Sequence, residues 1–141
     1  MAKKTLIKVT GTQRLGRDKD KIELTTVGTM EEKPNSYVFC YNEEQEPPLR
    51  PVQATLTVFK DEKRVEILRS GDNGSLLIIE RAKRNLCSYG TPYGELLMGI
   101  YGKSIENRIG EKQGTVTFGY DIDVNGALTS QNEVKLEYKI H

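Results

Sequence analysis

The feature that most constrains the fold is a two-residue alternation of apolar and polar side chains along almost the whole chain. The run VQATLTVF shows it clearly, because Val52, Ala54, Leu56 and Val58 fall on one face. Successive side chains of a β-strand point to opposite sides, so this period predicts strands with one buried face. No segment keeps a 3.6-residue period over three turns; residues 104–109 fit one helical turn or a continued strand equally well. We therefore predict an all-β protein.

Short polar segments separate the alternating runs and favour tight turns. The sequences GDNG at residues 71–74 and Asn-Gly at residues 125–126 are strong signals for β-hairpins. About nine short strands joined in this way, without a crossover helix, predict an antiparallel sheet. The edges of such a sheet need protection, so we expect a closed up-and-down barrel of about eight principal strands. A sandwich of two stacked sheets is the alternative.

The last predicted hairpin contains a mismatch of register. The apolar residues of both its strands are even-numbered, namely Val116, Phe118, Tyr120, Ile122 and Val124, then Val134, Leu136, Tyr138 and Ile140. A two-residue Asn-Gly turn pairs even with odd positions, which would turn the two apolar sets to opposite sides. A three-residue loop, or a bulge with Gly126 at positive φ, restores the match, and we expect the bulge.

Length, charge and cysteine content narrow the class of protein further. The 141 residues suffice for one domain, which we expect to span residues 1–141. The net charge is +1, so no overall field favours nucleic acid or an acidic membrane as a partner. No apolar core of a signal peptide follows the first lysines, and the longest apolar run, residues 76–79, is too short to span a bilayer. Cys40 and Cys87 stand alone, so we expect a cytoplasmic protein with two buried thiols.

Five segments carry a resemblance to a known family. They are residues 65–71 (VEILRSG), 77–80 (LIIE), 89–96 (YGTPYGEL), 103–105 (KSI) and 114–122 (GTVTFGYDI). On these segments the chain resembles the YwiB-like proteins, small bacterial proteins whose family has no assigned function. The resemblance implies a calycin-like β-barrel, similar to lipocalins in shape, in the cytoplasm of a bacterium. It assigns no catalytic or ligand-binding residue.

The stretch CSYGTPYGELLMGIYG, residues 87–102, concentrates tyrosine and glycine and raises the question of a binding site. The TPYG sequence within it matches a β-turn, with Pro at the second position and Gly at the fourth. All seven tyrosines are candidates to line a pocket for a flat ligand, and we single out Tyr89, Tyr93, Tyr101 and Tyr120 before Tyr37, Tyr41 and Tyr138. The alternative is that they are core or barrel-rim residues whose hydroxyls meet water or a carbonyl.

Arg69 is the strongest single candidate for a ligand contact. It shares a face with Val65 and Ile67, which are expected to point into the barrel. An arginine on an inward face needs a carboxylate or carbonyl partner, since burying it unpaired is very costly. Glu80, across the turn at residues 71–74, is a plausible partner, and Arg69 is then a candidate to recognise an anion inside a cavity. The alternative is a rim arginine whose guanidinium reaches water.

Motifs for catalysis and for cofactors are missing from the sequence. The single histidine is His141, the last residue, which leaves no ordered histidine for a triad or for a zinc site. No GxGxxG or Walker spacing occurs, so we expect neither an enzyme nor a bound cofactor. We predict a binding module for a small apolar or amphipathic molecule, anchored by Arg69 and one or more tyrosines. The alternative is a structural or protein-interaction barrel filled by its own side chains.

Two runs carry apolar side chains on both faces, which is unexpected for a free-standing barrel. Residues 76–79 place two on each face. In the second run Leu96, Met98 and Ile100 share one face and Leu97 and Tyr101 the other. Exposed apolar patches usually mark interfaces, so we predict a homodimer that buries the outward set. The alternative cover is the loop at residues 43–51.

Overall fold

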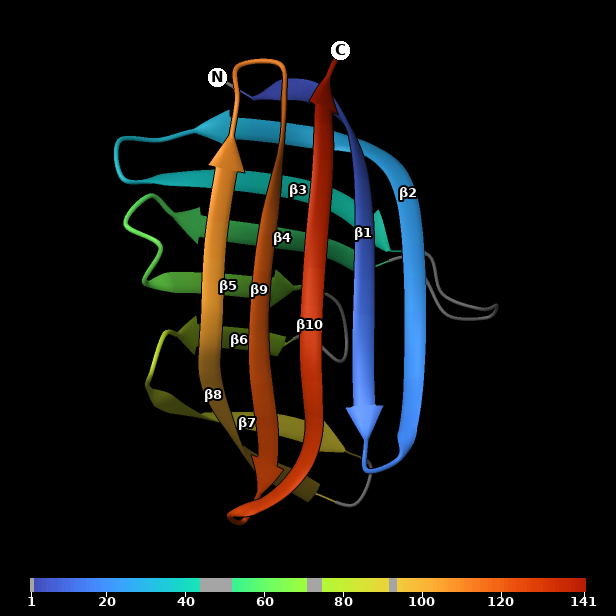
Figure 1. Cartoon of the computed structure of the whole chain (residues 1–141), viewed down its shortest axis with the longest axis vertical. Coiled ribbons are helices and arrows are strands. Elements are labelled where there is room, and N and C mark those ends of the chain that lie inside the picture. Colours follow the sequence, from blue (N-terminus) through green and yellow to red (C-terminus); the bar gives the residue numbers. More distant parts are fainter. Residues whose placement is uncertain (1, 44–51, 71–74, 92–93) are drawn as a thin grey trace.

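The computed structural model describes residues 2–43, 52–70, 75–91 and 94–141. Within these ranges the chain forms ten strands and no helix (Figure 1). The strands are β1 (Lys3–Leu15), β2 (Asp18–Glu32), β3 (Ser36–Glu43), β4 (Val52–Phe59), β5 (Arg64–Arg69), β6 (Ser75–Glu80), β7 (Arg84–Thr91), β8 (Gly94–Ile109), β9 (Gln113–Val124) and β10 (Ala127–Ile140). In the described part of the chain there is accordingly no helix long and apolar enough to cross a membrane.

All ten strands belong to one antiparallel sheet that curls into a nearly closed barrel. Their order is β6-β5-β4-β3-β2-β1-β10-β9-β8-β7, so neighbours in sequence are neighbours in space and β1 pairs with β10. The prediction of a closed antiparallel barrel is confirmed. It has ten strands rather than about eight, because the six-residue runs of β5 and β6 pair along their whole length and count as full members.

The two edge strands, β6 and β7, meet at a seam that side chains close. A parallel bridge joins Arg81 to Gly102 at one end of the seam. Further along, the Asn85 amide donates to the carbonyl of Ile78 at 3.4 Å, and the Cys87 thiol donates to the carbonyl of Leu76 at 3.2 Å. These bonds satisfy edge carbonyls that would otherwise lack a strand partner.

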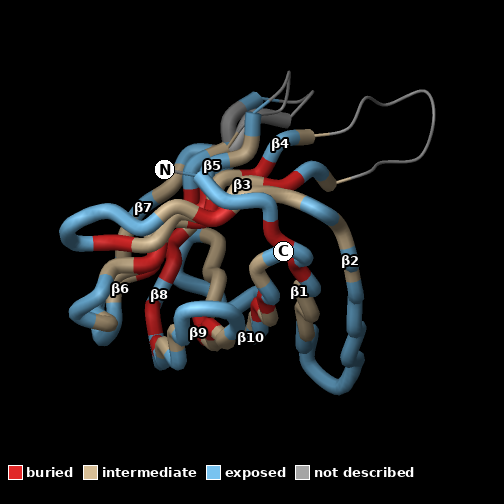
Figure 2. The backbone as a smooth tube through the Cα atoms, turned by 90° about the horizontal axis from the view of Figure 1, so that it is seen from above, coloured by how far each residue is buried: buried red, intermediate tan, exposed pale blue. Residues whose placement is uncertain are grey.

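The first hairpin is longer than the apolar alternation in the sequence indicates. Strands β1 and β2 pair from Lys3 with Met30 as far as Leu15 with Asp18, and Gly16 adopts a φ of 62° in the turn. The distal part of this hairpin is polar and exposed, and Figure 2 shows it extending away from the barrel. An exposed hairpin needs no apolar face, so its strands leave no periodic signal in the sequence.

The last hairpin contains the predicted bulge, although not at the predicted residue. Asn125 and Gly126 have φ values of 54° and 86°, and Val124 pairs directly with Ala127. The register then shifts between Leu128 and Ser130, which restores the match of the two even-numbered apolar sets. The sign of φ at Gly126 was predicted correctly, but it belongs to a two-residue primed turn, and the bulge follows a few residues later. 

A second register shift lies in β8, between Gly102 and Ser104. Beyond it the strand continues to Ile109, which decides between the helical turn and the continued strand at residues 104–109 in favour of the strand.

The interior of the barrel divides into two parts along the strands. We call the filled half the region of Ile7, Phe39, Val116, Leu136 and Tyr138, none of which is more than 3% exposed. The Phe39 and Tyr138 rings lie 5.3 Å apart across this half. The Tyr138 hydroxyl also donates to the carbonyl of Gly110 at 2.8 Å and accepts from its amide at 3.1 Å, which ties β10 to the β8–β9 turn.

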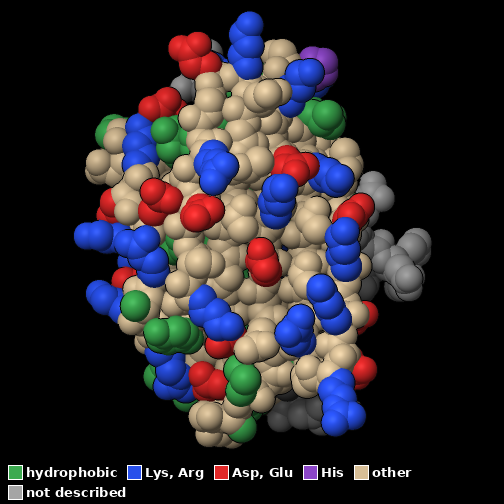
Figure 3. Space-filling model, viewed as in Figure 1, with side chains coloured by type: hydrophobic (Ala, Val, Ile, Leu, Met, Phe, Trp, Pro, Cys, Tyr) green, Lys and Arg blue, Asp and Glu red, His purple; other side chains and the backbone are tan. Residues whose placement is uncertain are grey.

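The other part of the interior, the open half, is lined by Val9, Gly11, Ile22, Leu24 and Val134. These residues occupy the inward positions of β1, β2 and β10 beyond the filled half, and none of them is fully buried. The outer face of β1 and β8–β10, by contrast, carries interspersed Lys, Arg, Asp and Glu side chains (Figure 3). The inward alternation thus places the candidate site inside the barrel, at the end where β1 and β2 separate from the core.

Candidate ligand-binding cavity

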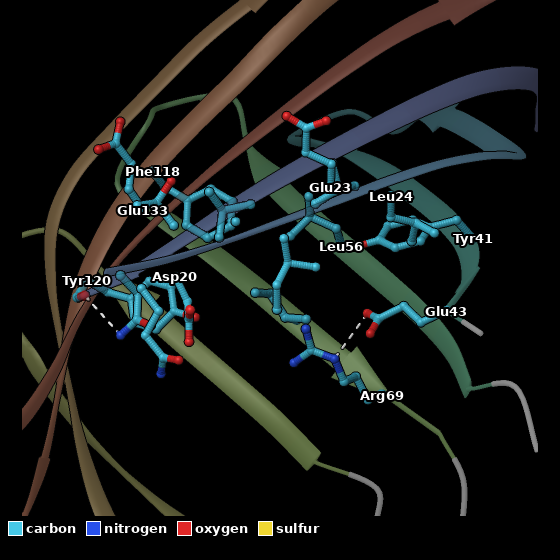
Figure 4. A pocket seen from close by; sticks show the side chains of 18 residues that line it. Asp20, Glu23, Leu24, Tyr41, Glu43, Leu56, Arg69, Phe118, Tyr120 and Glu133 are labelled. Atoms are coloured by element: carbon cyan, nitrogen blue, oxygen red, sulfur yellow. Dashed lines mark hydrogen bonds and ion pairs between the residues drawn. The ribbon is translucent and has the colours of Figure 1, made fainter. Parts of the chain in front are cut away.

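A cavity of about 490 Å³ occupies the open half of the barrel (Figure 4). Its deeper wall is apolar and includes Val9, Leu24, Leu56, Ile67, Phe118 and Val134. Polar side chains gather toward its mouth, among them Gln13, Asp20, Glu43, Arg69 and Asn132. The cavity is therefore amphipathic, with an apolar floor and a polar rim.

Part of the cavity is the space at Gly11, an inward position that carries no side chain. A Cβ atom added there would meet no heavy atom within 4 Å. On the neighbouring strands Gly11 faces Ile22 and Val134, and Ile22 remains 71% exposed. An apolar side chain so exposed on an inward face is surface that a ligand can cover.

Arg69 is the last residue of β5 and points into the barrel, as predicted. Its Nε donates to Glu43 Oε1 at 3.1 Å, and the two side chains are 35% and 29% exposed. The guanidinium therefore faces the cavity, as an anion-recognising arginine would, and also lies at the rim, as the alternative of a water-exposed arginine predicted. Figure 4 shows the far end of the guanidinium directed across the cavity, away from Glu43.

The predicted pairing of Arg69 with Glu80 is wrong. The β5–β6 register places Arg69 opposite Ser75 and Glu80 opposite Arg64, at the other end of the hairpin. Glu80 instead accepts a hydrogen bond from the Asn85 amide at 3.2 Å and lies 3.8 Å from the Lys83 ammonium. Glu43 takes its place because β3 lies two strands from β5 and ends beside Arg69.

Two buried tyrosines share the cavity with Arg69. Tyr41 and Tyr120 are 7% and 8% exposed, and both line the cavity. Burial, reinforced by the Glu43 carboxylate and opposed by Arg69, raises the pKa of Tyr41 to about 12. Burial likewise raises the pKa of Tyr120, again against the effect of Arg69. Both hydroxyls consequently stay protonated at neutral pH and can donate hydrogen bonds.

The six predicted site residues are thus brought together only in part. Arg69 and Tyr120 line the cavity, whereas Glu80 lies at the seam and Tyr101, at 41% exposure, faces outward. Tyr93 and the side chain of Tyr89 lie outside the described residues.

Sequence reasoning overlooked Glu43, Gly11 and Asn132, and it named Tyr41 among the seven tyrosines without singling it out. The signal that could have found Tyr41 and Glu43 is simple, since both continue the inward row that includes Phe39. Gly11 and Asn132 carry no comparable local signal. They reach the cavity because β1 pairs with β10, at opposite ends of the chain.

The chemistry available at the cavity is that of recognition. It offers one guanidinium, two protonated tyrosines, carboxylates and amides above an apolar floor. No group of three His, Cys, Asp or Glu side chains among the described residues could hold a metal ion. Such a cavity suits a molecule with an apolar body and a polar end.

Fold and cavity together define a ten-stranded antiparallel β-barrel with an amphipathic cavity at one end. The chain belongs to the family described as "Domain of unknown function (DUF1934)", whose model matches residues 7–136. It is also similar to the crystal structure of the ywiB protein from Bacillus subtilis, with a TM-score of 0.85 and 21% sequence identity. That similarity covers 99% of this chain and 93% of the other, and it confirms the predicted YwiB-like fold. No curated protein matches the chain.

Proposed function

We propose that the protein is a non-enzymatic binding module for a small apolar or amphipathic molecule. The observation that carries the proposal is the cavity of about 490 Å³, with an apolar floor and Arg69 at its rim. Ligand sites commonly have volumes of roughly 300–1,000 Å³ and combine apolar walls with a few placed polar groups. A molecule that covers Ile22 and Leu24 gains the free energy of removing apolar surface from water.

The alternative is a structural or protein-interaction barrel with a plugged interior, and the filled half is what that alternative predicts. The open half favours binding, because the inward position of Gly11 has room for a side chain and carries none. A barrel that serves only as a rigid scaffold gains stability when this space is filled, whereas a binding protein loses its site.

The proposal is tested with N-phenyl-1-naphthylamine, a neutral apolar dye that becomes fluorescent when it leaves water. We expect saturable binding by the unchanged protein and its loss in Gly11→Leu, which fills the cavity. Thr10→Leu is the matched control, because residue 10 is next in the chain but faces outward, opposite Glu23 and Lys135. Equal dye binding by both variants, or none by the unchanged protein, would contradict a binding cavity in the open half.

We also propose a cytoplasmic location. Both cysteines are free, with the Cys40 sulfur 3.8 Å from the Thr55 hydroxyl and Cys87 bonded to a carbonyl at the seam. Free thiols are typical of reducing compartments. Labelling of intact cells with a membrane-impermeant maleimide is expected to leave both thiols unmodified until the cells are lysed.

A further inference from the structure

We infer that the ligand is an amphipathic anion whose small oxyanion headgroup, of the carboxylate type, binds Arg69 at the cavity mouth. This inference rests on the proposed function and specifies the ligand class of the same cavity. The inference follows from the hydrogen-bond donors at the cavity mouth that have no acceptor among the described residues.

The guanidinium of Arg69 is only partly satisfied by the protein. Five N–H donors are available on an arginine, and Glu43 accepts from Nε alone. Within the described ranges the two Nη groups donate to no other side chain, and they are directed across the cavity (Figure 4). Two parallel Nη–H donors form a fork that matches the two oxygens of a carboxylate.

Glu43 holds this fork in place. Its contact with Nε fixes the plane of the guanidinium, and among the described residues the terminal nitrogens have no side-chain acceptor. It also supplies a negative charge that repels an incoming anion, so it orients Arg69 at a cost in affinity. Removing that charge while keeping the shape of the side chain should therefore strengthen the binding of an anion.

Two further donors lie close to Arg69. The Tyr41 and Tyr120 side chains are buried on the cavity wall, near enough for Arg69 to act on both hydroxyls electrostatically. Neither hydroxyl bonds to another protein group within the described ranges. An oxyanion at the fork would therefore find neutral O–H donors nearby, and its apolar tail would lie along Leu56, Ile67 and Phe118.

The competing ligand class is an amphipathic cation. Four carboxylates line the cavity and would attract an ammonium group, namely Asp20, Glu23, Glu43 and Glu133. Asp20, Glu23 and Glu133 are exposed to water and so screened, and Glu43 already pairs with Arg69. The directed donors of Arg69, Tyr41 and Tyr120 outweigh these acceptors.

The test compares three ligands with one tail. Decanoate, 1-decanol and decylammonium compete with N-phenyl-1-naphthylamine for the unchanged protein. We expect decanoate to displace the dye at a concentration about tenfold or more below that of decanol, because a charge-assisted fork adds to the apolar term. Decylammonium is expected to be the weakest. Equal displacement by decanoate and decanol, or tighter binding of decylammonium, overturns the anion inference while dye binding still supports the cavity.

Variants assign the preference to the fork. The double variant R69Q/E43Q replaces the ion pair by two neutral amides and leaves no unpaired charge, so we expect it to fold and to lose the preference for decanoate. The single variant Glu43→Gln is expected to bind decanoate several-fold more tightly. Glu137→Gln is the matched control, because Glu137 lies outside the cavity on the outer face of β10 and pairs with Lys135 at 3.1 Å; it should leave the displacement unchanged. A preference that survives in R69Q/E43Q would refute the role of Arg69.

Discussion

The filled half and the open half of the barrel follow one alternation but receive side chains of different size. On β1 the inward row runs from Ile7, which is fully buried, through Val9 to Gly11. On β10, which pairs with β1, the row falls from Leu136 to Val134 and then to the amide of Asn132. Periodicity therefore decides which face points inward, and side-chain size decides whether that face becomes core or cavity.

The largest expected difference between the halves is in the cost of removing a side chain. Phe39→Ala should lower the free energy of unfolding by about 3–5 kcal/mol, because the ring is fully buried and leaves a cavity in the filled half. Leu24→Ala, on the wall of the existing cavity, should cost under about 2 kcal/mol, since less buried surface is lost. Urea unfolding measures both. Similar costs for the two variants would mean that the open half is packed as tightly as the filled half.

Two glycines on the inward rows of β1 and β2 allow the opposite test, in which a side chain is added to each half of the barrel. A Cβ atom at Gly28 would overlap the carbonyl oxygen of Cys40 and lie 3.0 Å from Ile7 Cδ1. Gly28→Ala should therefore destabilise the protein by roughly 1–3 kcal/mol through overpacking. Gly11→Ala should be neutral or slightly stabilising, because the added methyl meets open space. Thermal unfolding in which both alanines have the same effect would show that the two sites are equally crowded.

The next effect concerns the boundary between the halves, where Tyr41 meets the cavity. Its pKa is raised from 10 to about 12, so the neutral form is favoured in the folded protein. This contribution is fully present below pH 10 and is lost as the pH rises through the folded pKa, by about 3 kcal/mol in total. Tyr41→Phe removes it, so stability measured by urea between pH 9 and 12 should fall less in that variant. Tyr101→Phe, on the outer face, is the control, and parallel curves for all three proteins would contradict the prediction.

Much of the architecture follows from the sequence because it depends on alternation, which is local. The inward faces of β4 and β9, the inward direction of Arg69 and the bulge in the last hairpin all follow from parity and from the Asn-Gly turn. The alternation of odd and even positions does not determine, however, which side chains on the inner face pair with one another. Glu80 and Glu43 were both available to Arg69, and only the barrel register shows that Glu80 lies at the wrong end of its hairpin.

The cavity itself is harder to predict, because its wall is assembled from distant parts of the chain. Gly11 and Asn132 meet through the β1–β10 pairing, and no local pattern marks that approach. The polar end of the first hairpin also cannot be predicted from the sequence, because exposed strands such as those around Gly16 need no alternation of apolar residues.

The smallest expected effect concerns the outer wall, where two strands are apolar on both faces. On β6, Leu77 and Ile79 point inward, which leaves Leu76 on the outer face at 44% exposure. Leu76 pairs with the half-exposed Leu68 of β5, and Leu97 of β8 is 52% exposed. We propose that this outer patch mediates a homodimer, and sedimentation equilibrium at micromolar concentration should give twice the chain mass. Leu76→Glu or Leu97→Glu should shift the mass toward the monomer without loss of stability, because neither side chain belongs to the core.

Leu6→Glu, at 43% exposure on β1, is the matched control and should leave the dimer intact. A monomer mass for the unchanged protein rules the dimer out, and the outer leucines then need a different explanation.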